Sequence, residues 1–316
     1  MYKIGVDLGG TNIAVGVIDE SFKIIGRGTV KTNAPRPAAE IFDDIAKAVD
    51  LALKDANLTL DDIATIGVGI PGSINKTTGN IEFSNNLDFH MVPARDMLSE
   101  RLGGKAVHID NDANCAALGE AYAGAGNGCK NLVAVTLGTG VGSGIIIDGK
   151  LVTGVGDAAG ECGHTVIIAG GTQCNCGRKG CWEAYASATA LIKQTKEKML
   201  ENKDSIMWEL AGGDIDKASG RTAWDAMRKG DKAGAEVVDK YIWYVAIGVA
   251  NIINALQPEV LCIGGGISNE KDNLIIPLTE KVNEEIYNKQ EGRSTKICVA
   301  GLKNDAGIIG AALLER

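Results

Sequence analysis

The sequence predicts an α/β fold built from two related halves, and two observations predict it. Apolar, strand-like runs alternate with helical patterns along the chain, which is typical of sheets whose faces are covered by helices. A strand, a glycine turn and a second strand occur in residues 3–19 and again in residues 131–150. Laid over each other without a gap, the two stretches pair Asp7 with Thr136, Leu8 with Leu137, Gly9 with Gly138 and Asp19 with Asp148. The repeat indicates a duplicated molecule, and the alternative is chance similarity between two glycine-rich hairpins.

Between these hairpins, the spacing of apolar residues sets the elements. The predicted elements are a helix over 38–56, a strand over 63–70 that ends at Pro71-Gly72, a strand over 107–110 and a helix over 113–123. The first helix is predicted from an apolar stripe formed by Ile41, Ile45, Val49 and Ala52. Asn111 or Asp112 is placed to cap the second helix.

After the second hairpin the chain is mostly helical by pattern. The predicted elements are helices over 190–200, 221–228 and 233–256, a strand over 260–263 that enters Gly264-Gly265-Gly266, and a final helix over 307–314. The most apolar stretch, Trp243 to Leu256, contains two asparagines and is stopped by Pro258. It is too short and too polar to span a bilayer, so we expect a buried helix.

Composition excludes several classes of protein. A chain of 316 residues suggests two domains or one very elaborated domain. The net charge of −8 opposes binding to nucleic acid and to anionic membranes, so we expect neither partner. The start, MYKIGVDLGG, has the pattern of a strand and not of a signal peptide. Five dispersed cysteines are expected to be reduced, structural thiols in a cytoplasmic protein: Cys115, Cys129, Cys162, Cys262 and Cys298.

The segment from Gly160 to Glu183 carries the most specific motif. It contains His164, Cys174, Cys176 and Cys181, which is the ligand set of a closed tetrahedral zinc site. The alternative is redox chemistry, with a labile disulfide between Cys176 and Cys181. Glu161 and Glu183 flank the ligands. Together with Asn85-Asn86 they supply carboxylates and amides of the kind that hydrogen-bond vicinal hydroxyls.

The two glycine turns predict anion sites. Gly9-Gly10-Thr11 and residues 137–142 can each present backbone N–H groups without a side chain in the way. Neither turn contains Lys or Arg, so a bound polyphosphate would need a divalent cation. Asp7 lies just before the first turn and is a natural ligand for Mg²⁺. Tight hairpins alone would also explain the glycines.

Asp110-Asn111-Asp112 places two carboxylates at a strand-to-helix junction. A carboxylate in this position serves either as a helix cap or as a catalytic group. The pattern by itself leaves both roles open.

Taken together, these motifs resemble the ROK family of repressors and sugar kinases and, within it, the bacterial glucokinases. The matching stretches are DLGGTN (7–12), GIPG (69–72), NNL (85–87), NDANCAALGE (111–120), LGTGVGSG (137–144), GECGH (160–164), CNCGRKGCWE (174–183) and GGGI (264–267). They follow the family's order over nearly the whole chain. The cysteine-rich stretch is the specific one, whereas GIPG or GGGI alone would not be.

The resemblance implies an actin-like (ribonuclease H-like), duplicated ATPase fold of two α/β domains with a cleft between them. The small domain would comprise residues 1–114 plus 301–316, and the large domain residues 115–300. The implied reaction is the ATP-dependent phosphorylation of the 6-hydroxyl of glucose to glucose 6-phosphate. Asp112 inherits the role of general base from the family's Asn-Asp pair.

The resemblance also implies the binding residues. Sugar would be held by Gly72, Asn86, Asn111, Asp112, Glu161, His164 and Glu183. ATP and Mg²⁺ would be held by Asp7, Gly9, Gly10, Thr11, Asn12, Gly138, Thr139, Gly140, Gly264, Gly265 and Gly266. Structural zinc would be held by His164, Cys174, Cys176 and Cys181, with the second ring nitrogen of His164 facing the sugar. Many relatives have Lys where this chain has Asn12, which leaves phosphate contact at position 12 open.

Alternatives within and beyond the family remain. The sugar could be fructose, allose, mannose, an N-acylmannosamine or N-acetylglucosamine, and the phosphoryl donor could be polyphosphate or another nucleotide. A sugar-responsive repressor would carry an additional N-terminal winged helix, whereas this chain begins three residues before its first core strand. A non-catalytic sugar-binding module would lack a carboxylate at position 112. Relatives are commonly homo-oligomers, so we expect a dimer or a tetramer.

Overall fold

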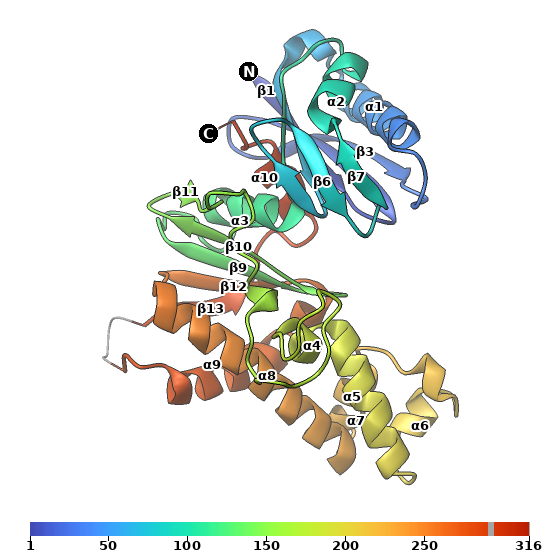
Figure 1. Ribbon diagram of the computed structural model, residues 1–316, viewed down its shortest axis with the longest axis vertical. Helices are drawn as coiled ribbons and strands as arrows, with labels where there is room; N and C mark the ends of the chain where they lie inside the picture. The colour runs from blue at the N-terminus through green and yellow to red at the C-terminus, as the bar shows by residue number, and fades with distance from the viewer. Residues whose placement is uncertain (290–293, 316) are drawn as a thin grey trace. The chain divides into compact units, whose positions relative to one another are not determined.

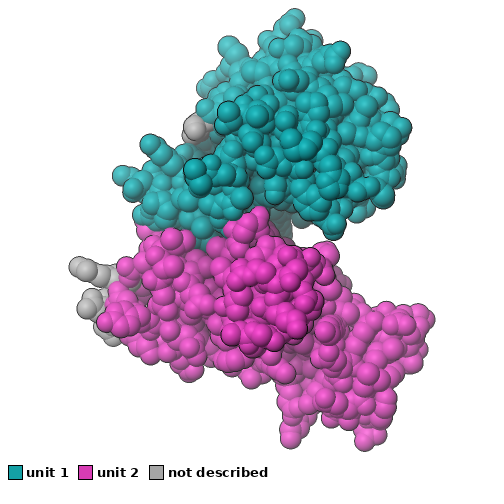
Figure 2. All heavy atoms as spheres, in the orientation of Figure 1, with its two compact units in different colours: residues 1–134, 143–160, 300–316 teal, residues 135–142, 161–299 magenta. Residues whose placement is uncertain are grey.

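The structure is a computed structural model, and it describes residues 1–289 and 294–315 (Figure 1). By contacts the chain divides into two compact units, coloured separately in Figure 2. Unit 1 comprises Met1–Ala134, Ser143–Gly160 and Ala300–Arg316. Unit 2 comprises Val135–Gly142 and Glu161–Val299.

The first sheet lies in unit 1 and has the strand order β3-β2-β1-β4-β8. Its strands are β1 (Tyr2–Leu8), β2 (Asn12–Ile18), β3 (Ile24–Lys31), β4 (Ile63–Ile70) and β8 (Val107–Asn111). β1, β2 and β3 pair antiparallel, whereas β4 pairs parallel with both β1 and β8. The predicted strand over 63–70 is confirmed, and the strand predicted over 107–110 runs one residue further. β3 was not predicted.

Helices cover both faces of this sheet. Ile4 and Val6 of β1 point into the core that β1 shares with α1 (Ala38–Ala56), the predicted helix. Gly5, between them, faces α10 (Asp305–Ala311), where a Cβ would lie 1.8 Å from the carbonyl oxygen of Ile308. Because neighbouring residues of a strand point to opposite faces, α1 and α10 cover opposite sides. α2 (Ala94–Arg101), which was not predicted, packs beside α1.

The second sheet has the order β11-β10-β9-β12-β13. Its strands are β9 (Leu132–Leu137), β10 (Val141–Ile147), β11 (Lys150–Leu151), β12 (Val260–Gly264) and β13 (Lys296–Val299). In the strand order, β9 and β10 occupy the positions that β1 and β2 occupy in the first sheet. β12 and β13 likewise occupy the positions of β4 and β8. The predicted duplication and the actin-like α/β fold class are therefore confirmed.

Helices make up most of the rest of unit 2. They are α4 (Glu183–Ala186), α5 (Ala188–Glu201), α6 (Met207–Leu210), α7 (Thr222–Arg228), α8 (Lys232–Leu256) and α9 (Asp272–Glu285). α8 packs against α5, α7 and α9 (Figure 1). The apolar stretch from Trp243 lies in α8 and is largely buried as predicted, although Trp243 itself is 41% exposed. No helix among the described residues combines the length and apolar character needed to cross a bilayer.

A small antiparallel sheet in unit 1 was not predicted. It contains β5 (Ser73–Asn75), β6 (Asn80–Ser84) and β7 (Phe89–Val92), and it fills the stretch between β4 and α2. Short strands and exposed polar residues hide it from a search for apolar runs. It leads the chain from Gly72 to Asn86, two of the residues predicted to bind sugar.

The contact-based units differ from the predicted domains in where residues 115–134, 143–160 and 300 belong. α3 (Asp112–Ala123) groups with unit 1 because its backbone lies against α10. A Cβ on Gly310 would lie 1.6 Å from the oxygen of Cys115, and one on Gly119 would lie 2.2 Å from the oxygen of Ala306. Contacts alone do not test the predicted domain division, which stays a prediction.

Candidate functional site

The junction between β8 and α3 shows which residue caps the helix. Asn111 is the N-cap: its Oδ1 accepts a hydrogen bond from the N–H of Ala113 at 2.8 Å. Its Nδ2 donates to the carbonyl oxygen of Gly72 at 3.1 Å, which ties two predicted sugar-binding residues together. Asp112 is the first residue of α3 and is only partly buried. Asn111 therefore supplies the cap, while Oδ1 of Asp112 accepts from the N–H of Ala113 at 2.9 Å.

Asp7 lies at the end of β1 and interacts with Asp112. Burial, with the negative charge of Asp112 as a second cause, raises the pKa of Asp7 to about 6. The following turn is exposed at Gly10, Thr11 and Asn12. Gly9 donates its N–H to the oxygen of Asn12 at 2.9 Å, and its own carbonyl accepts from Thr32 Oγ1 at 2.6 Å. Two carboxylates thus lie beside an exposed glycine turn, an arrangement that a divalent cation would stabilise.

The loop that contains Asn86 lies next to this turn. A Cβ on Gly10 would lie 4.0 Å from the backbone oxygen of Asn86. The side chain of Asn86 is exposed. Unit 1 therefore brings together Asp7, the first glycine turn, Asn86, Gly72, Asn111 and Asp112.

Asp7→Asn is expected to raise the thermal stability of the ligand-free protein, and to raise it more at pH 8 than at pH 5. The pKa of Asp7 is about 6 in the folded state against an ordinary value of 3.8. The folded state therefore binds this proton more tightly than the unfolded chain does. Ionisation of Asp7 lowers the free energy of unfolding as the pH rises from about 4 to above 6, by at most about 3 kcal/mol. Melting temperatures of both proteins at both pH values test this, and a pH-independent difference would contradict it.

The sequence reasoning missed one charged residue at this junction. Lys76, in the turn between β5 and β6, places its Nζ 2.5 Å from Oδ2 of Asp110. The side chain of Asp110 is 2% exposed. The sequence does not indicate this ion pair, because Lys76 resembles any lysine in an exposed turn and is far from Asp110 along the chain.

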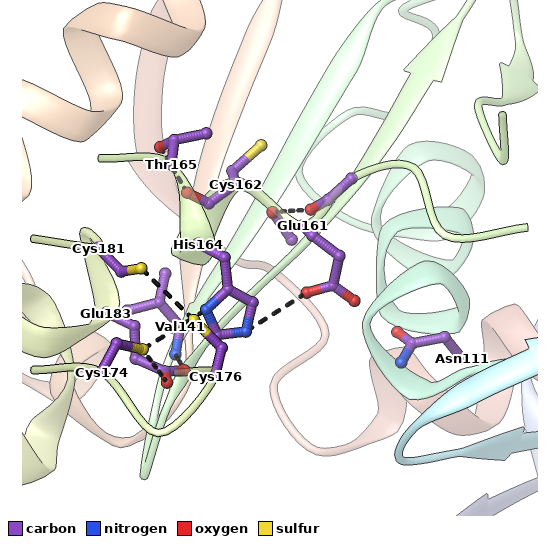
Figure 3. A network of polar contacts seen from close by, with 12 residues as sticks. Asn111, Val141, Glu161, Cys162, His164, Thr165, Cys174, Cys176, Cys181 and Glu183 are labelled. Atoms are coloured by element: carbon purple, nitrogen blue, oxygen red, sulfur yellow. Dashed lines mark hydrogen bonds and ion pairs between the residues drawn. The ribbon is translucent and has the colours of Figure 1, made fainter. Parts of the chain in front are cut away.

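In unit 2, the four predicted zinc ligands come together (Figure 3). One ligand atom from each of His164, Cys174, Cys176 and Cys181 lies within 4.8 Å of all the others. The Sγ of Cys174 is 3.7 Å from Nδ1 of His164, and the Sγ atoms of Cys176 and Cys181 are 3.6 Å apart. All eight cysteines are free thiols.

The separations of 3.7 and 3.6 Å fit a tetrahedral zinc site, whereas the spread of 4.8 Å over the whole set is about 1 Å wider than such a site requires. With zinc–sulfur and zinc–nitrogen distances near 2.3 and 2.0 Å, tetrahedral ligand atoms are about 3.5–3.8 Å apart. Burial raises the pKa of Cys174 to about 12 and raises that of Cys181, whereas the backbone N–H of Arg178 lowers that of Cys176. The donor set and its spacing therefore suit zinc, which binds such thiols as thiolates.

Local backbone chemistry shapes this loop. Gly180 has a φ of 86°, and a Cβ there would lie 1.8 Å from the oxygen of Ile168. Trp182, directly after the last ligand, is fully buried and donates its indole N–H to the oxygen of Tyr244 at 2.9 Å. Its ring occupies the space beside Gly248 of α8. The loop is thereby fixed to the longest helix of unit 2.

The two predicted sugar-binding glutamates lie beside the predicted metal ligands and make different contacts there (Figure 3). Glu161 is exposed, and its Oε2 lies 3.9 Å from Nε2 of His164, the ring nitrogen that faces away from Cys174. Glu183 accepts a hydrogen bond from the N–H of Val141 at 2.9 Å, while its other oxygen lies 3.8 Å from the Sγ of Cys174. Glu183 therefore joins the cysteine loop to the second glycine turn.

The second and third glycine segments meet in unit 2. Gly138 donates its N–H to the oxygen of Gly140 at 3.0 Å, which closes the turn around Thr139. Gly265, with a φ of 80°, lies against the end of β9, where a Cβ would lie 2.4 Å from the oxygen of Leu137. Gly264 ends β12, and Gly265 and Gly266 are exposed. Unit 2 therefore gathers these glycines near Glu183.

Comparisons with known proteins agree over the full chain. Residues 3–316 match the sequence model of the ROK family. The glucokinase of Thermotoga maritima is 39% identical over 310 residues, which cover 98% of this chain and 95% of that protein. The glucokinase of Halalkalibacterium halodurans is 40% identical over 320 residues, with coverages of 100% and 95%. A ROK family glucokinase from Streptomyces griseus, solved with glucose and AMPPNP, has a TM-score of 0.85 and 32% identity over 99% of both chains.

Proposed function

The chain belongs to the ROK family, and on that premise we propose that it is an ATP-dependent glucokinase that makes glucose 6-phosphate. The observation that carries the proposal is the pairing of Asp112 with Asp7 beside the exposed turn Gly9-Gly10-Thr11. This arrangement offers a base beside a glycine turn that is exposed at Gly10 and Thr11. Glucose and ATP as substrates come from similarity to the glucokinases, one of which was solved with glucose and an ATP analogue.

In the proposed reaction, Asp112 accepts the proton of the 6-hydroxyl as that oxygen attacks the γ-phosphorus of ATP. A new oxygen–phosphorus bond forms, the bond between the γ-phosphorus and the bridging oxygen breaks, and ADP leaves. Phosphoryl transfer needs mainly positioning and charge neutralisation, so one base and a set of backbone donors suffice as protein groups. Asn111, fixed by its bonds to Ala113 and Gly72, holds the neighbouring residue in place.

We assign sugar contacts to Asn86, Asn111, Glu161, His164 and Glu183, whose side chains would bind hydroxyls, with the backbone of Gly72 contributing. Nε2 of His164 is the ring nitrogen turned away from Cys174, which suits a sugar contact. The residues proposed for ATP are Gly9, Gly10, Thr11, Asn12, Gly138, Thr139, Gly140, Gly264, Gly265 and Gly266.

Two metals complete the proposal. Asp7 would bind Mg²⁺, which when bound neutralises phosphate charge. His164, Cys174, Cys176 and Cys181 would hold a structural zinc, because all four tetrahedral positions are filled by protein and none remains for substrate. The zinc, when bound, holds the loop that carries Glu161 and Glu183.

A panel of hexoses with coupled detection of ADP tests the proposal directly. The expected result is that kcat/KM for glucose exceeds the values for fructose, allose, mannose, N-acylmannosamine and N-acetylglucosamine. If glucose ranks far below another sugar, the substrate assignment is wrong although the kinase assignment stands. Replacing ATP by polyphosphate in the same assay identifies the donor. Sugar binding without turnover of any hexose would favour a sugar-responsive regulator.

We also propose a cytoplasmic location, the division into domains 1–114 plus 301–316 and 115–300, and assembly into a dimer or tetramer. The five cysteines outside the proposed zinc site form no disulfide, which suits a reducing compartment. Light scattering on the purified protein measures the mass of the assembly, and a monomer would contradict the last proposal.

A further inference from the structure

Lys76 and Asp110 form an ion pair whose members differ greatly in exposure. The side chain of Lys76 is 34% exposed, whereas that of Asp110 is 2% exposed. Among the described residues, no hydrogen-bond donor is assigned to Oδ2 of Asp110. The ammonium group of Lys76, 2.5 Å away, is therefore the group that compensates the buried charge of Asp110. A buried carboxylate depends strongly on such a partner.

The turn that carries Lys76 is fixed from two sides. The N–H of Lys76 donates to Oδ2 of Asp157 at 3.0 Å. Arg95 of α2 donates through its two Nη atoms to the oxygens of Lys76 and Thr77, at 3.2 and 3.1 Å. The backbone of Lys76 is thus held before its side chain reaches Asp110, which indicates a preorganised cation and not a loose surface lysine.

Asp110 in turn holds the start of α3. Its Oδ1 accepts from the backbone N–H of Asn111 at 2.7 Å and from Nδ2 of Asn114 at 2.9 Å. The two bonded residues, Asn111 and Asn114, lie before and after Asp112 in the sequence. The position of the proposed base therefore depends on Asp110.

We propose that Lys76 and Asp110 act as a positioning pair for Asp112. The inference rests on the glucokinase proposal and adds two residues to it. Lys76 orients the carboxylate of Asp110, and Asp110 fixes residues 111–114 through its hydrogen bonds. Other ionisable groups beside this cluster are Asp7 of β1, Cys115 of α3, and Asp157 and Arg95, which hold the backbone of Lys76. α10, which packs on α3, carries Asp305, whose charge is paired with Arg27.

The two members of the pair are expected to depend on each other. Lys76→Met leaves the buried Asp110 without its ion-pair partner, and Asp110→Asn leaves Lys76 without its partner. The double variant Lys76→Met/Asp110→Asn removes both charges together.

Turnover should follow the same logic. Lys76→Met is expected to lower kcat about tenfold or more, with a smaller change in the KM for ATP, because the base is displaced and the phosphate turns are not. Lys76→Arg should retain most of the activity. The double variant should be more active than Lys76→Met alone.

Lys3→Met provides a control that removes a lysine from another ion pair of unit 1. Lys3 pairs with Glu315, whose side chain is partly exposed, at the opposite end of β1 from Asp7. This variant should lose stability while kcat stays near that of the wild type. A kcat of Lys76→Met near that of the wild type, or a double variant less active than Lys76→Met, would overturn the inference.

An activity-independent measurement separates this inference from the proposed function. Hydrogen exchange at the amides of residues 111–114 should be faster in Lys76→Met than in the wild type, and near wild type in Lys76→Arg. Unchanged exchange would refute the positioning role whatever the enzyme phosphorylates. If the wild type phosphorylates a different hexose, the kinetic tests apply unchanged with that sugar.

Discussion

Asp112→Asn is expected to lower kcat for glucose by about three orders of magnitude or more, while the affinity for glucose changes little. A positioned base contributes roughly 10²–10⁴ to a rate, and an amide cannot accept the proton. Asparagine preserves the shape of the side chain and can still accept the N–H of Ala113, which Asp112 Oδ1 accepts at 2.9 Å. Because Asn111 supplies the cap, the start of α3 should survive the change.

The measurement is steady-state kinetics with isothermal titration of glucose on the same protein. Asp272→Asn is the matched control, because Asp272 is the first residue of α9 as Asp112 is of α3. It removes the same charge from the same helical position and should leave kcat unchanged. A residual kcat within tenfold of the wild type for Asp112→Asn would remove Asp112 as the base.

Cys176→Ser is expected to abolish zinc binding and to lower the melting temperature by about 5 °C or more. Cys176 is exposed, so exchanging its thiol for a hydroxyl has little effect on packing. A large loss of stability would therefore report a lost metal ligand. The KM for glucose should rise as well, since Glu161, His164 and Glu183 lie on the same loop.

Metal analysis of the wild type should give about one zinc per chain. Cys162→Ser is the control, because Cys162 belongs to the same segment and lies outside the ligand cluster. It should retain zinc and nearly the full melting temperature. A fully active, metal-free wild type would contradict the structural role of zinc.

Long, regular elements could be predicted because their own residues carry the pattern. The helix over 38–56 and the strand over 63–70 have the predicted bounds. The two hairpins agree with the repeat, since β2 and β10 begin at Asn12 and Val141, which the gapless overlay pairs. The cysteine cluster was predictable because its ligands are close in sequence.

Other features depend on contacts between remote residues. β3 contains Gly26 and Gly28, which look like breaks in a strand but let α1 approach, since a Cβ on Gly28 would lie 1.9 Å from the oxygen of Ala48. α9 contains Pro277, which interrupts a helical pattern. Whether Asn111 or Asp112 caps α3 required the hydrogen bonds themselves. The partner of Asp110 could not be inferred, because nothing near it in sequence points to Lys76.

Glu183 has a consequence for how substitutions in this protein are interpreted. Its two oxygens lie against different segments, one bonded to the N–H of Val141 and the other beside the Sγ of Cys174. Removing the carboxylate therefore disturbs the second glycine turn and the proposed metal ligand Cys174 at once, in addition to any sugar hydroxyl that Glu183 binds. A single kinetic constant for Glu183→Ala would therefore combine three effects that need not be additive. Only variants that change one neighbour at a time can assign a contribution to this side chain.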